Sequence, residues 1–221
     1  MRKHLAIIGD LKGSRHIADR AQAQLEIKKA LEDINRAYPE CITSKLTLTL
    51  GDEFQALLKP CPKLMQMLDS LALLLRDYPF RLGLGYGEIS TAIDKNISIG
   101  ADGEAYWQAR AAIDYVHDNN AGGKVKTHLC GFSPLEDELL NALFEASDTI
   151  KYGWTNLQTE TFHHMLEHGI YTPSLEQNTF AQRIGISQSS LTKRLNAGNI
   201  KLYLKIRNLI GTSIQEWQDE N

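Results

Sequence analysis

The pattern of hydrophobic residues changes character once along the chain. Up to about residue 130, short segments in which apolar and polar residues alternate are interleaved with segments of helical spacing. From Ser133 onward only the helical spacing remains. Alternation with a period of two is typical of strands, and recurrence every three or four residues is typical of amphipathic helices. We therefore expect an α+β domain over residues 1–132, followed by a smaller all-α region over residues 133–221.

The first region predicts the element order strand, helix, strand, strand, helix, strand, helix, strand. This order fits an antiparallel sheet with helices on one face, the ferredoxin-like arrangement. The expected strands are residues 5–9, the two halves of 45–58 around a Gly51–Asp52 turn, 81–90 and 124–129, and the expected helices are 18–38, 62–75 and 104–117. In the second region, helices are expected at about 135–150, 155–168, 177–184, 188–197 and 200–210.

Composition excludes several classes of protein. The 221 residues are 43% hydrophobic and 23% charged, which is typical of a globular chain. No apolar run approaches the roughly 20 residues that span a bilayer, and the N-terminal apolar run is too short for a secretory signal. Three cysteines without CxxC spacing, Cys41, Cys61 and Cys130, argue against a disulfide framework and a zinc site. A cytoplasmic location is the default expectation.

Two carboxylates mark the first candidate site. Asp10 ends the first strand, and Asp52 sits in the turn of the predicted hairpin. If the two strands are neighbours, these carboxylates lie side by side at one edge of the sheet, which suits a divalent cation or a metal pair. The alternative is that each Asp only forms a turn, a common role for this residue.

Four segments carry a family resemblance: IIGD, TLTLGDEFQALL, RLGLGYGEI and IGADGEAYWQARAA. Together they resemble the palm domain of class III nucleotidyl cyclases. The resemblance implies Asp10 and Asp52 as catalytic metal ligands for Mg²⁺ or Mn²⁺ and Arg110 as the arginine that stabilises the transition state. More narrowly, IGDLKGSRHIADR and DGEAYWQAR resemble the SatD family of bacterial proteins. That resemblance covers roughly residues 4–115 and extends into the helical tail.

The chain departs from the cyclase pattern where that family reads the base. Tyr106 stands where the family helix has Asn, Leu46 stands where a purine-selecting Lys is expected, with Lys45 one place away, and Ile99 stands where an Asp is expected. The metal half of the site therefore matches the family and the base-reading half does not. A standard adenylate cyclase is not expected.

The loop after the first strand is a candidate phosphate site. Lys12, Gly13, Ser14 and Arg15 supply backbone N–H groups and positive charge, although the spacing is not that of a Walker A loop. The alternative is a solvated loop. Glu53 follows Asp52 and is expected to point to the opposite face of the strand, which makes it a weaker candidate.

The segment TFAQRIGISQSSLTKRL resembles a helix-turn-helix DNA-binding module within residues 155–211. Ala181 permits a close helix crossing, Gly185 permits the sharp turn, and Ser187 suits the N-cap of the second helix. Residues 177–215 hold six basic residues and no acidic one, although the whole chain carries −3. The residues expected to contact DNA are Gln188, Ser189 and Thr192 at base edges and Lys193, Arg194 and Lys201 at phosphates.

We expect from these features a cytoplasmic, homodimeric DNA-binding transcriptional regulator, because one helix-turn-helix reads only a half-site. Its cyclase-like domain would bind a nucleotide or metal ligand or mediate dimerisation. One alternative is a metal-dependent nucleotidyl cyclase or nucleotidyltransferase that acts on an NTP, with a tail for localisation or dimerisation. Two others are a degenerate scaffold without a ligand, and a helical tail that serves docking rather than DNA.

Overall fold

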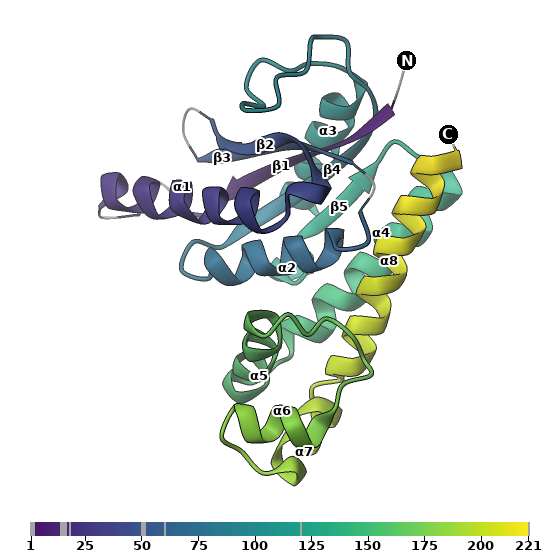
Figure 1. The fold of residues 1–221 in the computed structure, drawn as a ribbon. Helices are drawn as coiled ribbons and strands as arrows, with labels where there is room; N and C mark the ends of the chain where they lie inside the picture. The colour runs from purple at the N-terminus through teal and green to yellow at the C-terminus, as the bar shows by residue number, and fades with distance from the viewer. Residues whose placement is uncertain are drawn as a thin grey trace.

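A computed structural model describes residues 3–13, 17, 19–49, 52–59, 61–119 and 121–220. These residues form an α+β fold with five strands and eight helices, which confirms the predicted fold class (Figure 1). The strands are β1 (Lys3–Leu11), β2 (Ile42–Leu48), β3 (Glu53–Leu58), β4 (Phe80–Glu88) and β5 (Thr127–Cys130). The helices are α1 (Arg20–Ala37), α2 (Leu64–Leu74), α3 (Glu104–Asp118), α4 (Pro134–Tyr152), α5 (Asn156–Glu167), α6 (Gln177–Arg183), α7 (Gln188–Ala197) and α8 (Ile200–Glu220).

The five strands form one sheet in the order β2-β3-β1-β4-β5. Strand β1 lies at the centre and pairs antiparallel with β3 and β4, and β2 pairs antiparallel with β3. Strand β5 pairs parallel with β4, so the sheet is mixed rather than wholly antiparallel as expected. The reason is the connection through α3, because a helical crossover returns the chain in the same direction as the strand before it.

Helices cover both faces of this sheet, whereas the sequence pattern was expected to give helices on one face. Helix α3 packs on the face that carries Ala6, Ile8 and Leu57, and α1 and α2 pack on the opposite face. Glycines on β4 let α3 approach: a Cβ at Gly83 or Gly85 would lie 2.2 or 2.1 Å from a backbone oxygen of α3. The central strand is consequently buried on both sides, which its unbroken apolar run indicates.

The helical region contributes to two hydrophobic clusters. Leu140 and Phe144 of α4 and Ile210 and Ile214 of α8 pack into the main core, together with α1, α2 and the sheet. Helices α5, α6 and α7 and the first half of α8 form a second cluster around Phe162, Leu191 and Tyr203 among others. Figure 1 shows α8, coloured yellow, running antiparallel beside α4 from this second cluster back to the sheet region.

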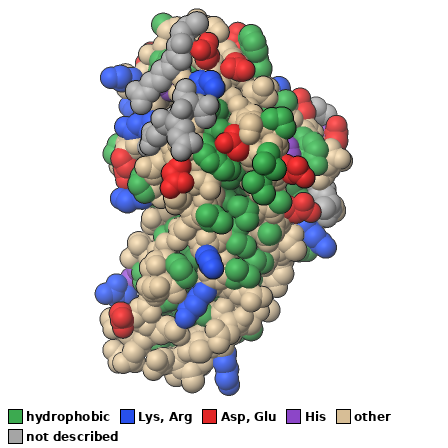
Figure 2. All heavy atoms as spheres, turned by 90° about the vertical axis from the view of Figure 1, so that its right-hand side faces the viewer, with side chains coloured by type: hydrophobic (Ala, Val, Ile, Leu, Met, Phe, Trp, Pro, Cys, Tyr) green, Lys and Arg blue, Asp and Glu red, His purple; other side chains and the backbone are tan. Residues whose placement is uncertain are grey.

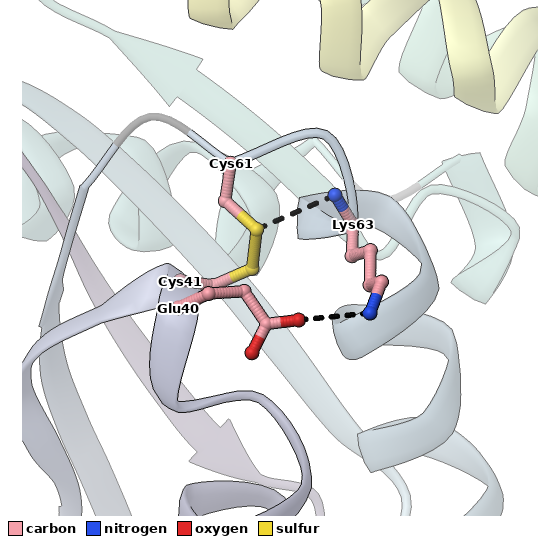
Figure 3. Close-up of a disulfide and its surroundings, with 4 residues drawn as sticks. All are labelled: Glu40, Cys41, Cys61 and Lys63. Carbon is pink, nitrogen blue, oxygen red and sulfur yellow. Dashed lines mark hydrogen bonds and ion pairs between the residues drawn. A yellow bond between two sulfur atoms is a disulfide. The ribbon is translucent and has the colours of Figure 1, made fainter.

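Cys41 and Cys61 form a disulfide, contrary to the expectation from cysteine number and spacing (Figure 3). Their Cα atoms are 5.0 Å apart, within the usual range for a bridge, and both residues are buried. Lys63 lies over the bridge, donating its backbone N–H to Cys61 Sγ at 3.3 Å and pairing its Nζ with Glu40 at 3.0 Å. The bridge joins the start of β2 to the segment before α2, two places that are distant in sequence and adjacent in the fold. Cys130 is a free cysteine.

In the part of the chain that the structure describes, no helix has both the length and the apolar character needed to cross a membrane.

Candidate functional site

Three loops meet at the end of the sheet where β1 finishes. The backbone N–H of Leu11 donates to the carbonyl of Asp52 at 3.0 Å, and that of Lys12 donates to the carbonyl of Pro79 at 2.7 Å. These hydrogen bonds hold the end of β1 between the starts of β3 and β4. Asp10 and Asp52, the two predicted metal ligands, therefore lie at the same end of the sheet. Gly51, the other half of the predicted turn, lies outside the described residues.

Two cross-strand neighbours share the face of Asp10. The register pairs Asp10 with Glu53 on β3 and with Arg81 on β4. Arg81 Nη2 contacts Asp10 Oδ2 at 2.6 Å. Burial raises the pKa of Asp10 above its ordinary value; Arg81 opposes this rise, and the nearby carboxylates of Asp52 and Glu53 add to it. Asp10 is thus a partly buried carboxylate that lies near two other carboxylates and pairs with Arg81.

Arg110 reaches this cluster from α3. Its two terminal nitrogens each donate to one oxygen of Glu53, both at 2.7 Å, in the bidentate geometry typical of arginine and carboxylate. This pairing raises the pKa of Arg110 further, with smaller contributions from Asp114 and Asp10. Because α3 packs closely against the glycines of β4, Arg110 can reach Glu53 on β3.

Arg81 is the member of this cluster that the sequence did not indicate, and Glu53 was expected only as a weaker candidate. The strand alternation did indicate that Glu53 and Asp52 point to different faces. Asp52 borders a small hollow with Arg20, Ala23 and Ile27 of α1, on the face opposite α3. What the pattern lacked was the register, which puts Glu53 rather than Asp52 directly across from Asp10.

The fit to a divalent ion can be judged from the partners of these carboxylates. Both oxygens of Glu53 accept from Arg110, and Asp10 accepts from Arg81. An ion between them would have to displace a guanidinium, so the arrangement as it stands fits a metal poorly. Within the described residues, no group of three or more His, Cys, Asp or Glu side chains is placed to hold a metal ion. A Mg²⁺ or Mn²⁺ ion on Asp10 and Asp52 stays a prediction.

The predicted phosphate loop is only partly described. Lys12 and Gly13 follow β1 directly, and Gly13 has φ +69°, a left-handed conformation that favours glycine. Burial lowers the pKa of Lys12, and the positive charges of Arg81 and Lys126 lower it further. Lys12 therefore belongs to a local cluster of cations. Ser14 and Arg15 lie outside the described residues.

Two of the three positions at which the chain departs from the cyclase pattern hold buried residues, and the third, Ile99, is 47% exposed. Tyr106 of α3 and Leu46 of β2 are both buried in hydrophobic clusters. Lys45 Nζ donates to the side-chain oxygen of Asn96 at 2.9 Å. These side chains serve packing and loop attachment, in keeping with the departures seen in the sequence.

Helices α6 and α7 are joined by a four-residue turn. Gly185 in the turn has φ +71°, and Ser187 caps α7 by accepting the backbone N–H of Ser190 at 3.2 Å. Ala181, Leu191 and Leu195 are buried between the helices, as the spacing predicted. The local geometry of a helix, a glycine turn and a capped second helix is therefore present at the predicted residues.

The predicted DNA-contacting residues differ in how available their side chains are. Gln188, Ser189 and Lys193 are exposed on α7. Thr192 Oγ1 lies 2.9 Å from both Gln177 Oε1 and the carbonyl of Gln188, and Arg194 Nη1 lies 3.4 Å from Thr161 Oγ1. Lys201 is half-buried at the start of α8.

One basic residue of the tail is not on its surface. Arg207 was counted among the six cations of residues 177–215, but it is buried, 4% exposed, against Asp69 of α2. The charge that the tail offers to solvent therefore comes from the other five residues: Arg183, Lys193, Arg194, Lys201 and Lys205.

The fold defines an α+β protein with a helical extension, and the sequence places it in a family. A model of the SatD family matches residues 4–214, so the chain belongs to the SatD family. No curated protein matches the chain. Among solved structures, that of a bacterial light-regulated adenylyl cyclase is similar at a TM-score of 0.42 and 12% identity, covering 58% of this chain and 75% of that one.

Proposed function

We propose that the protein binds duplex DNA through α6 and α7. The observation that carries this proposal is the capped N-terminus of α7, which presents exposed Gln188, Ser189 and Lys193 on a segment without acidic residues. A recognition helix contacts base edges with the side chains of its first turns while flanking cations contact phosphates. Gln188 and Ser189 therefore read bases, and Lys193 and Lys201 neutralise the backbone. Thr192 and Arg194 act after they exchange their internal partners for DNA.

The proposal includes a homodimer formed along α4 and α8. Four leucines on the outer sides of these helices are 48–66% exposed: Leu135, Leu139, Leu202 and Leu209. Figure 2 shows hydrophobic side chains gathered along this side of the molecule. A second copy, related by a two-fold axis that runs parallel to α8 beside the molecule, would cover these leucines. It would also place both copies of α7 at the same end, as two adjacent half-sites require.

DNA binding is tested by fluorescence anisotropy with mixed-sequence duplexes over a series of salt concentrations. Affinity is expected to fall with salt, and Lys193→Gln should weaken binding and reduce the salt slope by about 1. Lys29→Gln, an exposed lysine on α1, is the matched control and should bind as the wild type does. Absence of salt-dependent binding, or equal effects of the two substitutions, would contradict the proposal.

The dimer is tested separately by light scattering on the full chain. Leu139→Lys and Leu209→Lys should give monomers, because each puts a charge into the proposed interface. Leu25→Lys, at an exposed leucine on α1, should leave the mass unchanged. A wild-type monomer at micromolar concentration would rule out this interface.

A second proposal is metal-dependent nucleotidyl transfer at the end of the sheet. The observation in its favour is that Asp10 and Asp52 lie at the same end of the sheet, where the backbone N–H of Leu11 donates to the carbonyl of Asp52 at 3.0 Å. A metal ion would first have to displace the guanidinium of Arg81 from Asp10. The test is pyrophosphate release from each NTP with Mg²⁺ or Mn²⁺. Asp10→Asn and Asp52→Asn should abolish release, and Asp77→Asn, at an exposed site, should not. No release from any NTP would leave this region as a scaffold.

A further inference from the structure

A cavity of about 190 Å³ lies between the sheet region and the helical region. Helix α2 and strands β4 and β5 form one wall, and α4, α5 and α8 form the other. The neighbouring elements can be followed in Figure 1, where α2 faces the lower parts of α4 and α8. The cavity is separate from the cluster around Asp10 and from α7. None of its residues was a predicted site residue.

The charged residues that line this cavity are mostly cations. Four side chains that carry a positive charge at neutral pH meet only two carboxylates, Asp69 and Asp148. The four are Arg76, Lys126, Lys151 and Arg207. The lining therefore has an excess of two positive charges. Lys12 adds to the positive field, since its charge and that of Lys126 repel one another.

Arg207 is the deepest of these cations and is not fully satisfied. Its Nε lies 3.4 Å from Asp69 Oδ2, and its guanidinium lies over the rings of Phe144 and Tyr203, at 5.7 and 5.8 Å. Its Nη1 is buried and has no hydrogen-bond partner among the residues that the structure describes. A buried guanidinium N–H without an acceptor destabilises the folded state, so this group favours binding of an acceptor from outside the chain.

Asp69 cannot supply that acceptor, because it is already shared. It accepts Lys151 Nζ at 2.9 Å and the hydroxyls of Tyr203 and Tyr171, at 2.6 and 2.5 Å. The carboxylate of Asp148 accepts the backbone N–H of Lys126 at 2.9 Å. At the mouth, Arg76 Nε lies 3.8 Å from Asp77 Oδ2 in an exposed pair, so the unmet donor inside the cavity is that of Arg207.

We propose that this cavity binds the phosphate group of a small molecule, with Arg207 and Lys151 at its base and Arg76 and Lys126 at its mouth. A doubly charged phosphate matches the excess of two positive charges, and its oxygens suit guanidinium and ammonium donors. The volume is below the roughly 300–1,000 Å³ of sites that enclose a drug-sized ligand. It accommodates inorganic phosphate or pyrophosphate, or the phosphate end of a larger molecule.

A ligand at this position would tie the two regions of the chain together. Arg76 lies just after α2 and Lys126 just before β5, whereas Lys151 and Arg207 belong to α4 and α8. Occupancy would favour one orientation of α8 relative to the sheet. If the DNA-binding proposal above holds, the ligand would thereby adjust the position of α7; the binding itself does not depend on that proposal.

Calorimetric titration of the full chain with inorganic phosphate, pyrophosphate and ATP, at constant ionic strength and without DNA, tests the site. Saturable binding of at least one probe is expected, and Lys126→Gln and Arg76→Gln should each weaken it about tenfold. Both side chains are exposed at the mouth, so the fold should survive, which thermal unfolding checks. Lys29→Gln is the matched loss of charge on α1 and should leave the affinity unchanged.

The three probes distinguish the sources of the phosphate group. Binding of phosphate or pyrophosphate identifies a free anion as sufficient, and binding of ATP alone identifies a larger molecule whose phosphate enters the cavity. No saturable binding of any probe would overturn the proposal. Equal affinity in the wild type, Lys126→Gln and Arg76→Gln would overturn it as well, because the anion would then bind elsewhere. DNA binding is measured independently, so failure of either proposal is distinguishable.

Discussion

Asp69→Asn is expected to lower the free energy of unfolding by about 3–5 kcal/mol, the usual effect of removing one partner from a buried ion pair. Asp69 is 3% exposed and faces Lys151, Arg207 and two tyrosine hydroxyls. The amide keeps the size of the carboxylate and one acceptor oxygen. The loss therefore reports mainly the charge that Arg207 and Lys151 no longer meet.

The pH dependence gives an independent measure of the same interaction. Burial acts to raise the pKa of Asp69, but Arg207, Lys151 and the two hydroxyls outweigh it and lower the pKa from 3.8 to about 2. A depressed carboxyl pKa contributes stability above the unfolded pKa and loses it as pH falls toward the folded pKa. The contribution is about 2 kcal/mol at neutral pH, and about half of it is lost by pH 3.

Urea unfolding at pH 6 and pH 3 checks both numbers. The difference in free energy between the wild type and Asp69→Asn should shrink by about 1 kcal/mol from pH 6 to pH 3. Asp77→Asn, at an exposed residue 3.8 Å from Arg76, should cost less than about 0.5 kcal/mol. Adding Arg207→Met to Asp69→Asn should restore stability by removing the unmatched cation. A loss below about 1 kcal/mol, or an unchanged difference at pH 3, would refute the reasoning.

Three other perturbations act on the fold. Replacing Cys41 and Cys61 by Ala should cost about 3 kcal/mol, because the bridge closes a loop with a sequence separation of 20; an unchanged urea midpoint would contradict this. Gly85→Ala should lower the free energy of unfolding by at least about 1–3 kcal/mol, because its Cβ would lie 2.1 Å from backbone atoms of α3. Gly153→Ala should be nearly neutral, because the nearest atom to its Cβ would be 3.6 Å away. Thermal unfolding compares the two. Gly185→Ala should cost about 1–2 kcal/mol because of its φ of +71°, and Gly185→Asn should cost less, which urea unfolding compares directly.

Local patterns predicted most elements, because strand alternation, helical spacing and capping residues act over a few neighbours. Ser187 is an example, since it caps the helix whose start it marked. The packing of helices on both faces of the sheet was harder to predict from the sequence. Gly83 and Gly85 fall in a predicted strand, but the sequence does not show why they are glycines. The structure does, because α3 packs against them on the second face of the sheet and leaves no room for a side chain.

The candidate site depended on contacts between distant segments, and these were the least predictable. Glu53 faces Asp10 because of the register between β1 and β3, and a shift of one residue would have put Asp52 there instead. Arg207 was counted with the basic residues of the tail, and its sequence neighbours do not indicate that its partner, Asp69, lies on α2. Cys41 and Cys61 meet for the same reason, since spacing along the chain does not encode proximity in the fold.

Helix α8 has a consequence for how the chain can be divided. Its 21 residues form a rod of about 30 Å whose two halves are anchored in different hydrophobic clusters. Excising the chain at residue 132 would strip Leu140, Phe144, Ile210 and Ile214 from the main core. We therefore expect that the sheet region does not fold as a free-standing unit. Its unfolding and that of the helices around α7 should be coupled into one cooperative transition.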